Sequence, residues 1–453
     1  MLQRIFHLKE NGTDVRTEAI AGLTTFLSMV YILAVNPSIL SAAGMEPGAV
    51  FTATAVSAAF ASLCMAFFAN YPVALASGMG INAYFAYSVC MPMAQDGIQD
   101  PWTIALTAVL VEGIIFILLS LTRFRETLVD EVPQNLKLGI TAGIGLFIAL
   151  IGLEEAGIVV GDPSTLVAVG DMGSPAFMLA LAGFLLIAFM SHKKITGAVL
   201  WGILAVWILG ILAQLAGWYQ VDPEEGMNSL IPEFSQLSFI PQAPMLFDFD
   251  FSYVTDHFIE FAVIVFSFLY VDLFDTVGIL IGVGSKAKLL DEKGRLPRVG
   301  RALMADAVGT VAGACLGTST VTSYAESNAG IAQGGRTGLT AVVTAGLFIA
   351  ALFFSPLFLA VPSFAVASAL IYVGLLMADA IQKMNFESDI ADSAGGFMAF
   401  LMMPLTYSIA NGIMFGIITW VILKVLIGKG KSIHPVMWIT FFLFVLRILT
   451  LVF

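Results

Sequence analysis

Apolar runs of about 20 residues, the length a helix needs to cross the hydrocarbon core of a bilayer, recur along the whole chain of 453 residues. Only 11% of the residues are charged, whereas a soluble domain carries about 25%. The chain therefore lacks the charge that a water-exposed surface of ordinary size requires. The period-2 alternation typical of a transmembrane β-barrel is absent from the sequence. The sequence predicts an all-α polytopic membrane protein.

Charged or Pro/Gly-rich breaks between the apolar runs predict fourteen transmembrane spans. The first seven are expected near 17–41, 49–69, 72–91, 102–122, 134–153, 176–191 and 196–218, and the second seven near 254–283, 299–316, 318–334, 337–360, 363–381, 391–408 and 409–427. A last apolar stretch, 435–453, carries Arg447 midway. Because of that arginine, we expect it to lie in the membrane interface as a C-terminal helix rather than to cross.

The distribution of basic residues fixes the expected orientation. With a cytoplasmic N-terminus, every loop containing Lys or Arg is cytoplasmic, as the positive-inside rule requires; these residues are Arg4, Lys9, Arg16, Arg123, Arg125, Lys193, Lys194, the cluster within 286–301, Arg336, Lys383, Lys424, Lys429 and Lys431. The opposite loops hold acids instead, namely Asp96, Asp162, Glu224 and Glu225. We expect both termini to be cytoplasmic, in the cell inner membrane. The net charge of -12 argues against a nucleic-acid partner, which calls for a basic face.

Seven is an odd number, so two seven-span halves must run in opposite directions through the membrane. This is the inverted-repeat plan of secondary transporters. Short internal similarities sit at equivalent places in the two halves: FLSMVY (26–31) resembles VFSFLY (265–270), and GINA (80–83) resembles ESNA (326–329).

The third and tenth spans are interrupted. They read YPVALASGMGINAYFAY (71–87) and GTSTVTSYAESNAGIAQGG (317–335), with Gly, Ser, Thr or Asn near the middle. Unwound backbone at membrane depth occurs only where it is buried in protein or lines a cavity, and a matched pair of broken segments indicates a transporter's binding site. For 77–80, tight packing through small residues remains an open alternative. Close helix packing through small residues does not explain a carboxylate in such a segment, so we expect Glu326 to bind the ligand.

Two carboxylates lie in the apolar eighth span, FSFLYVDLFDTVGILIGVG (266–284). Asp272 and Asp275 are three residues apart, so they point the same general way on a helix. An ionised Asp at the bilayer centre costs about 2.5–3.5 kcal/mol, which makes both functional candidates. We expect Asp272 to contact the ligand and Asp275 to hold a broken helix through backbone hydrogen bonds. Either carboxyl could also exchange a proton during function.

Three further carboxylates lie at membrane depth in unbroken helices. Glu112, Asp306 and Asp379 are therefore expected to serve packing or interhelical hydrogen bonds, with Asp306 also a candidate for supporting the site or coupling protons and Asp379 near a span end.

Several segments carry a family resemblance. They are TEAIAGLTTFLSMVYILAVNP (17–37), MGINAYFAYSV (79–89), FLYVDLFDTVG (268–278), GTSTVTSYAES (317–327), GGRTGLTAVV (334–343), FFSPL (353–357) and MMPLTYSIANGI (402–413). In these stretches, which span essentially the whole chain in order, the sequence resembles the AzgA-like purine permeases of the nucleobase–cation symporters.

The resemblance implies fourteen spans in two inverted seven-helix repeats, with core and gate domains and short strands in spans 3 and 10. The implied divisions are 17–122 (core, first repeat), 123–218 (gate, first repeat), 254–360 (core, second repeat), 361–434 (gate, second repeat) and 435–453 (C-terminal helix). The base would bind between the two domains.

The resemblance also assigns residues to the site. The family's binding asparagine falls on Asn82 beside Gly80, its span-8 carboxylate on Asp272 with Asp275 following, and its span-10 glutamate on Glu326. Phe85 or Tyr324 would cover the ring face, and Thr322 is placed among the binding residues. Asp275, Asp306 and Asn328 would support the site or couple protons, although the role of Asn328 in substrate choice stays open.

The expected function is import of a purine nucleobase by proton symport, with hypoxanthine or guanine favoured and adenine the further candidate. No cofactor is expected; the expected partners are the base, the proton and membrane lipid, and a homodimer is an assembly that the sequence allows. The alternative is a carrier of the same fold for another nucleobase, such as xanthine or uracil, or for an anion. An intramembrane aspartyl protease is disfavoured because Asp272 and Asp275 share one helix, and a channel is disfavoured by the broken helices at inverted positions.

Overall fold

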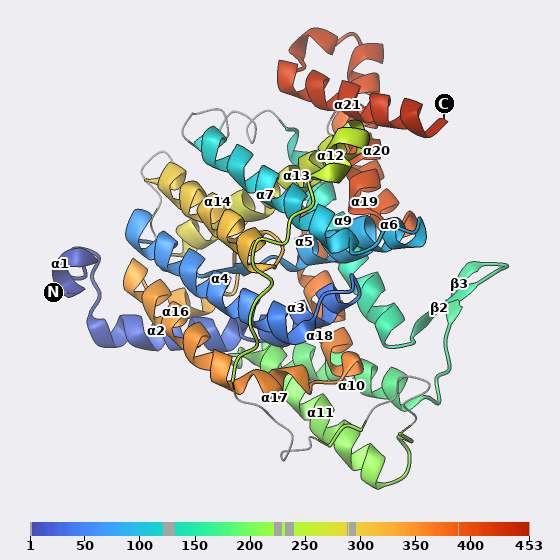
Figure 1. The fold of residues 1–453 in the computed structure, drawn as a ribbon. Coiled ribbons are helices and arrows are strands. Elements are labelled where there is room, and N and C mark those ends of the chain that lie inside the picture. Colours follow the sequence, from blue (N-terminus) through green and yellow to red (C-terminus); the bar gives the residue numbers. More distant parts are fainter. Residues whose placement is uncertain are drawn as a thin grey trace.

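The computed structural model describes residues 2–120, 132–221, 229–231, 240–287, 289, 296–387 and 389–452. Over these ranges the chain is a helical bundle with two small two-stranded sheets (Figure 1). Ten helical segments in the described ranges are long and apolar enough to cross a membrane, which confirms a predominantly helical, multi-pass membrane protein. The predicted boundary at 122–123, together with Arg123, Arg125, Glu224 and Glu225, lies outside the described residues.

The elements of the N-terminal half follow the predicted spans closely. They are α1 (Leu2–Ile5), α2 (Val15–Met29), α3 (Ile32–Ser41), α4 (Pro47–Phe68), β1 (Leu75–Ser77), α5 (Met79–Ala83), the π-helix η1 (Tyr84–Cys90), α6 (Met91–Gln95), α7 (Pro101–Ser120), α9 (Gln134–Glu155), β2 (Val159–Asp162), β3 (Leu166–Val169), α10 (Pro175–His192) and α11 (Ala198–Leu215).

The elements of the C-terminal half begin after the loop that precedes the eighth span. They are α12 (Ser252–Asp256), α13 (Phe258–Lys286), α14 (Val299–Leu316), β4 (Val321–Ser323), α15 (Ser327–Ala332), α16 (Gly338–Ala351), η3 (Leu352–Phe354), α17 (Ser355–Leu359), α18 (Ser363–Ala378), η4 (Asp379–Lys383), α19 (Ile390–Leu405), α20 (Ile409–Leu426), η5 (Gly430–Ser432) and α21 (Pro435–Val452).

The two interrupted spans pair with each other through β1 and β4. The strands are antiparallel, with Ala76 opposite Thr322 at the centre of the register. Two further backbone bonds extend the ladder, from Gly78 N to Thr320 O at 3.0 Å and from Tyr324 N to Ala74 O at 3.0 Å. The backbone groups that each broken helix leaves free are therefore satisfied inside the protein, as membrane depth requires. The expected short strands in the third and tenth segments are confirmed.

The helices pack in two groups. In the first group, α4 contacts α14 and α16, α14 contacts α7, and α2 contacts α16; β1 packs on α4 and β4 on α14. In the second group, α9 contacts α18 and α19, α19 contacts α20, and α10 contacts α11 and α18. Glycines allow close backbone approach in both groups: a Cβ at Gly338 would lie 2.5 Å from Ala66 O, and one at Gly139 would meet the backbone oxygen of Gly396.

Glu18 ties α16 to α2 within the first group. Its fully buried carboxylate accepts from the backbone N–H groups of Arg336 at 2.9 Å and Thr340 at 3.1 Å, and from the Thr340 hydroxyl at 2.6 Å. These are N–H groups at the start of α16, where a helix has unpaired donors and a partial positive charge. A carboxylate is stable there although it is removed from water.

Two features were not predicted in detail. The hairpin β2–β3 projects from the bundle in the acidic loop after α9 (Figure 1). Helix α21 packs against α13 and α20, burying Met437 and Phe444, and the Tyr270 and Thr440 hydroxyls lie 2.7 Å apart. The interfacial position expected for 435–453 stays a prediction.

Candidate functional site

The candidate site is a cavity of 260 Å³ where the two broken spans meet the second packing group. One wall comes from the segment after β1 and from the end of β4, together with Asp275 of α13. The other wall comes from α9, α18 and η4, and is largely aliphatic, with Val373, Leu376 and Met377. The two walls belong to different packing groups: the first carries the carboxylates of Asp275 and Glu326, and the second is aliphatic along α18.

Glu326 lies in this cavity, in the turn between β4 and α15. Its Oε1 accepts a hydrogen bond of 2.5 Å from the hydroxyl of Tyr31, which is 1% exposed and lies at the break between α2 and α3. This hydrogen bond orients the Glu326 carboxylate. A carboxylate accepts through both oxygens, so Oε2 can still accept a hydrogen bond from a ligand in the cavity.

The two aspartates of α13 are placed differently from each other. Asp275 lines the cavity together with Thr322 and Glu326. Asp272 is fully buried and is not among the lining residues; its Oδ1 lies 3.1 Å from the Thr276 hydroxyl, which also lies 2.9 Å from Oδ1 of Asp306. The structure thus brings Asp275, rather than Asp272, to the cavity beside Glu326, and groups Asp272 with Asp306.

Gly80 lines the cavity, whereas Asn82 lies behind it. A Cβ at Gly80 would lie 2.6 Å from Cγ2 of Ile144 on α9, so glycine permits the close approach of the two packing groups. The fully buried Asn82 accepts hydrogen bonds through Oδ1 from Ser77 at 2.8 Å and from Ser319. Asn82 therefore joins the start of the third segment's helix to the strand region of the tenth.

Of the remaining predicted residues, some line the cavity and others lie outside its lining. Tyr324 and Thr322 line the cavity, and the Tyr324 hydroxyl donates to Ser77 O at 2.5 Å. Phe85 is fully buried in η1, with its ring 6.3 Å from that of Phe268, and is not a lining residue. Asn328 donates through Nδ2 to Ala325 O at 2.8 Å and closes the turn that carries Glu326.

Sequence reasoning missed the residues that reach the cavity from elsewhere. Tyr31 contacts Glu326 across the fold, and Thr141 of α9 lines the cavity from the opposite wall. Asp379 and Lys383 also line it; they are exposed and form an ion pair at 3.2 Å. The only sequence signal for Tyr31 was its place at the end of FLSMVY, the motif shared with the eighth span.

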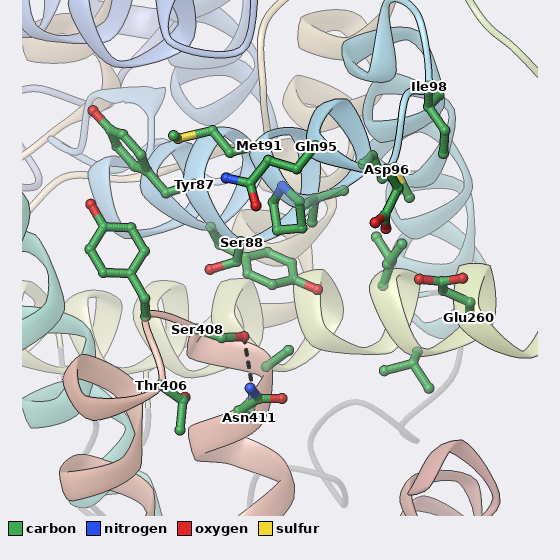
Figure 2. Close-up of a pocket in the computed structure, with 18 of the residues that line it drawn as sticks. Tyr87, Ser88, Met91, Gln95, Asp96, Ile98, Glu260, Thr406, Ser408 and Asn411 are labelled. Carbon is green, nitrogen blue, oxygen red and sulfur yellow. Dashed lines mark hydrogen bonds between the residues drawn. The ribbon is translucent and has the colours of Figure 1, made fainter. Parts of the chain in front are cut away.

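A second and larger hollow, of 780 Å³, lies at another part of the boundary between the packing groups (Figure 2). Gln95 and Asp96 lie on one wall and Ser408 and Asn411 on another, with Glu260 at one end. Its lining residues include none of the predicted binding residues.

Two tyrosine–glutamate hydrogen bonds border this hollow. Tyr87 of η1 donates to Oε1 of Glu155 at 2.7 Å, and Tyr407 donates to Oε2 of Glu154 at 2.7 Å. The two rings meet edge to face with centroids 6.2 Å apart. The Tyr87 bond crosses from the third segment to α9, whereas the Tyr407 bond stays within the second packing group.

A further tyrosine–glutamate pair lines the same hollow. The hydroxyl of Tyr253 donates to Glu260 at 2.8 Å. Burial and this hydrogen bond raise the pKa of Tyr253 above its ordinary value, so the phenol stays a neutral donor.

A membrane bundle in which two broken, strand-paired segments face a second helix group across a small polar cavity has the architecture of a membrane carrier. In its fold, the chain is similar to the transmembrane domain of a cyanobacterial bicarbonate transporter, BicA, with a TM-score of 0.64 at 17% identity, covering 87% of this chain and 97% of that one. The chain belongs to the Permease family (Xan_ur_permease), whose sequence model matches residues 16–415.

Relatives within this family match nearly the whole chain. The adenine permease AdeP of Escherichia coli is 42% identical over 99% of this chain and 96% of its own length. The guanine/hypoxanthine permease PbuO of Bacillus subtilis is 42% identical over 99% of this chain and 100% of its own length.

Proposed function

We propose that this permease imports purine nucleobases by proton symport, with hypoxanthine and guanine as the favoured substrates and adenine as the further candidate. The observation that carries the proposal is the pairing of Asp275 and Glu326 in one small cavity formed by both broken spans. Relatives named for adenine and for guanine and hypoxanthine support the purine class. Because both kinds are 42% identical to this chain, identity alone does not separate these bases.

The two walls fit a flat ring with a polar edge. A purine presents ring N–H donors and N or O acceptors around an apolar face. Carboxylates of Asp275 and Glu326 would accept from ring N–H groups, and the hydroxyl of Thr322 can both donate and accept. The aliphatic wall of Val373 and Leu376 would cover one ring face by apolar contact. Asp272 and Asn82 would act from behind the cavity, by holding the residues that touch the base.

The proposed architecture is fourteen spans in two inverted repeats. The ten apolar helices account for every predicted span except the third, eighth, tenth and thirteenth. The third and tenth correspond to the strand-containing segments, the eighth to the 29-residue α13 and the thirteenth to the 16-residue α19. The first packing group would be the core (17–122 and 254–360) and the second the gate (123–218 and 361–434).

Transport would proceed by movement of the core against the gate. The cavity reaches the exposed pair Asp379–Lys383, and Lys383 is on the side that the positive-inside rule assigns to the cytoplasm. The structure would then be an inward-facing state, and the larger hollow of Figure 2 would be the closed outer approach.

Uptake into proteoliposomes tests the proposal. Purified protein is reconstituted with a lumen near pH 7.5 and an outside near pH 6.5, and labelled hypoxanthine is added with and without a protonophore. One proton per base can drive about tenfold accumulation across about one pH unit. Competition by unlabelled guanine, adenine, xanthine and uracil then names the substrate. No uptake of any purine by folded protein contradicts the proposal, and uptake that ignores the protonophore contradicts proton symport.

A further inference from the structure

Helix α21, at the edge of the bundle (Figure 1), returns from the far end of α20 to the larger hollow. Helix α20 begins beside that hollow, which Asn411 lines, and its other end carries Lys424, which pairs with Asp389 at 2.9 Å. Residues 427–434 connect the two helices, so α21 starts near the Lys424 end. Arg447 of α21 then lines the same hollow as Asn411. Because a helix rises about 1.5 Å per residue, both helices cover roughly 20 Å between these ends. Helix α21 therefore runs antiparallel to α20.

A contact partway along α21 fixes its path. The hydroxyl oxygens of Thr440 and Tyr270 lie 2.7 Å apart, and both residues are buried. Tyr270 lies further along α13 than Glu260, whose side chain lines the hollow. The charges of Arg447 and Glu260 both act on the phenol of Tyr253. From Thr440 to Arg447, α21 therefore follows α13 from the level of Tyr270 toward the hollow.

The polar residues of α21 face the protein, whereas its exposed side chains are apolar. Thr440 and Arg447 are seven positions apart, which puts them on one side of a helix. The first is buried against α13 and the second lines the hollow. The exposed side chains include Ile439, Phe442 and Leu446. A helix lying in the membrane interface has the reverse arrangement, with its polar face toward water. The pattern of α21 is that of a helix between protein and lipid.

The hollow accounts for an arginine in so apolar a helix. Charged side chains in membrane helices face a cavity or a partner charge. Asp96 and Glu260 lie at one end of the hollow (Figure 2), and the charges of both carboxylates and of Arg447 act on Tyr253. The 18 residues of α21 extend about 27 Å, close to the roughly 30 Å of a hydrocarbon core. Arg447 thus agrees with a helix that crosses the membrane.

We propose that α21 crosses the membrane as a further span and forms a wall of the larger hollow, where Arg447 sets the charge that entering solutes meet. This position replaces the interfacial one predicted from the sequence. The end of α21 then lies on the membrane face opposite to Ser432, which precedes the helix. Arg447 offsets the negative charge of Asp96 and Glu260, so that the hollow does not repel solutes carrying partial or full negative charge. The inference goes beyond the proposed function, because it holds whichever solute the permease carries.

Cysteine labelling locates the two ends of α21. Each variant is made in protein whose native cysteines are replaced by alanine, and a membrane-impermeant maleimide is applied to intact cells and to inverted vesicles prepared from them. We expect Arg447→Cys to react from the same face as Ser88→Cys, which also lines the hollow. Ser432→Cys, in the exposed loop before α21, should react from the other face. Reaction of Arg447→Cys and Ser432→Cys from the same face overturns the crossing.

A variant that keeps the arginine covers the case in which Arg447→Cys reacts from neither face. A cysteine is then placed on a short Gly/Ser extension after Phe453 and compared with Ser432→Cys in the same way. Labelling of the two from opposite faces supports the crossing, and labelling from one face overturns it.

A second measurement tests the charge of Arg447. Ser88→Cys is labelled from the face of the hollow by two thiosulfonate reagents of similar size and opposite charge. We expect Arg447→Gln to shift the ratio of the two rates toward the cationic reagent by about twofold or more, because the hollow loses a positive charge. Arg447→Lys keeps that charge and should retain the ratio, as should Lys431→Gln, which removes an exposed cation before α21.

The two assays are independent of transport. An unchanged ratio in Arg447→Gln overturns the placement of this charge at the hollow, and an equal shift in Lys431→Gln overturns it as well. Since neither assay requires uptake of a base, a failure of the proposed purine import leaves both results interpretable.

Discussion

The hydroxyl of Tyr31 donates to Oε1 of Glu326 at 2.5 Å, joining residues that are 295 positions apart in the chain. Tyr31 lies at the break between α2 and α3, and Glu326 precedes α15. A cavity carboxylate held in this way has a fixed direction before any ligand arrives, and preorganised groups bind more tightly because less freedom is lost on binding.

Tyr31→Phe should therefore weaken binding of the base without removing the cavity. A hydrogen bond to a charged group contributes about 1.5–3 kcal/mol, which corresponds to a rise of KM or Kd of roughly tenfold or more. Equilibrium binding of labelled base to the purified variant measures the change. Tyr270→Phe, which removes the hydroxyl facing Thr440 instead, is the matched control and should bind like the wild type. Equal affinities for the two variants would sink the positioning role of Tyr31.

Asp275→Asn should reduce affinity for the base, because an amide oxygen and amide hydrogens replace a carboxylate facing the cavity. The charged hydrogen bond lost is again about 1.5–3 kcal/mol, so Kd should rise roughly 10- to 100-fold. Asp379→Asn changes another carboxylate that lines the cavity, which is exposed and already paired with Lys383; because that charge is engaged and solvated, we expect a change of less than about threefold, which makes it the contrast within the same cavity. An Asp275→Asn variant that binds normally would remove Asp275 from the binding residues.

The sequence was sufficient to predict the interrupted segments and the short strands, because their signals are local. Gly, Ser, Thr and Asn within an apolar span directly indicate unwound backbone, and the structure has β1 and β4 at those places. Glu326 stood out for the same reason, as a lone carboxylate in such a segment. Five of the ten predicted site residues line the cavity, namely Gly80, Asp275, Thr322, Tyr324 and Glu326.

The roles of Asp272 and Asp275 could not be separated from spacing alone. Three residues on a helix differ by about 60° in direction, which is enough for one carboxyl to face the cavity and the other to face α14. That choice depends on where α14 places Asp306, whose Oδ1 accepts from the Thr276 hydroxyl although 30 residues separate the two in the chain. Tyr31 and Thr141 were missed for the same reason, since a hydroxyl in an apolar helix carries no sign of its distant partner.

Gly80→Ala should impair transport by separating the two packing groups. The new Cβ would lie 2.6 Å from Cγ2 of Ile144, and overpacking of this kind costs about 1–3 kcal/mol. Because Ile is stiff about its first side-chain torsion, the helices must shift. The second substitution Ile144→Ala removes the clashing atom and should restore part of the uptake rate. Uptake by Gly80→Ala at the wild-type rate, or no recovery in a correctly folded double variant, would show that close approach here is not limiting.

Asp389 gives a prediction for the pH dependence of stability. Lys429 at 2.7 Å and Lys424 at 2.9 Å hold the pKa of the Asp389 carboxyl well below its usual range. A carboxyl with a lowered folded pKa stabilises the fold above its unfolded pKa, near 3.9, and this contribution is lost as the pH falls through the folded value.

Asp389→Asn should thus lower the free energy of unfolding at neutral pH by on the order of 1 kcal/mol, and with it the melting temperature. The difference from the wild type should shrink below about pH 4. Thermal unfolding in detergent at several pH values measures this, and a difference that does not change with pH would contradict the ion-pair origin.

Tyr87 and Tyr407 allow a test of which contacts hold the larger hollow closed. The Tyr87–Glu155 bond joins the third segment to α9, so it exists only while the two packing groups keep their present arrangement. Tyr407–Glu154 lies within one group and should survive any movement between the groups. Removing a hydrogen bond to a carboxylate costs about 1.5–3 kcal/mol, so Tyr87→Phe should raise the population of the state with an open outer approach by roughly tenfold.

The measurement is the rate at which a water-soluble thiol reagent labels Ser88→Cys, in a background where Cys64, Cys90 and Cys315 are alanine. We expect faster labelling in Tyr87→Phe and the parent rate in Tyr407→Phe. The same rate in both variants would mean that the Tyr87 bond does not control access to the hollow.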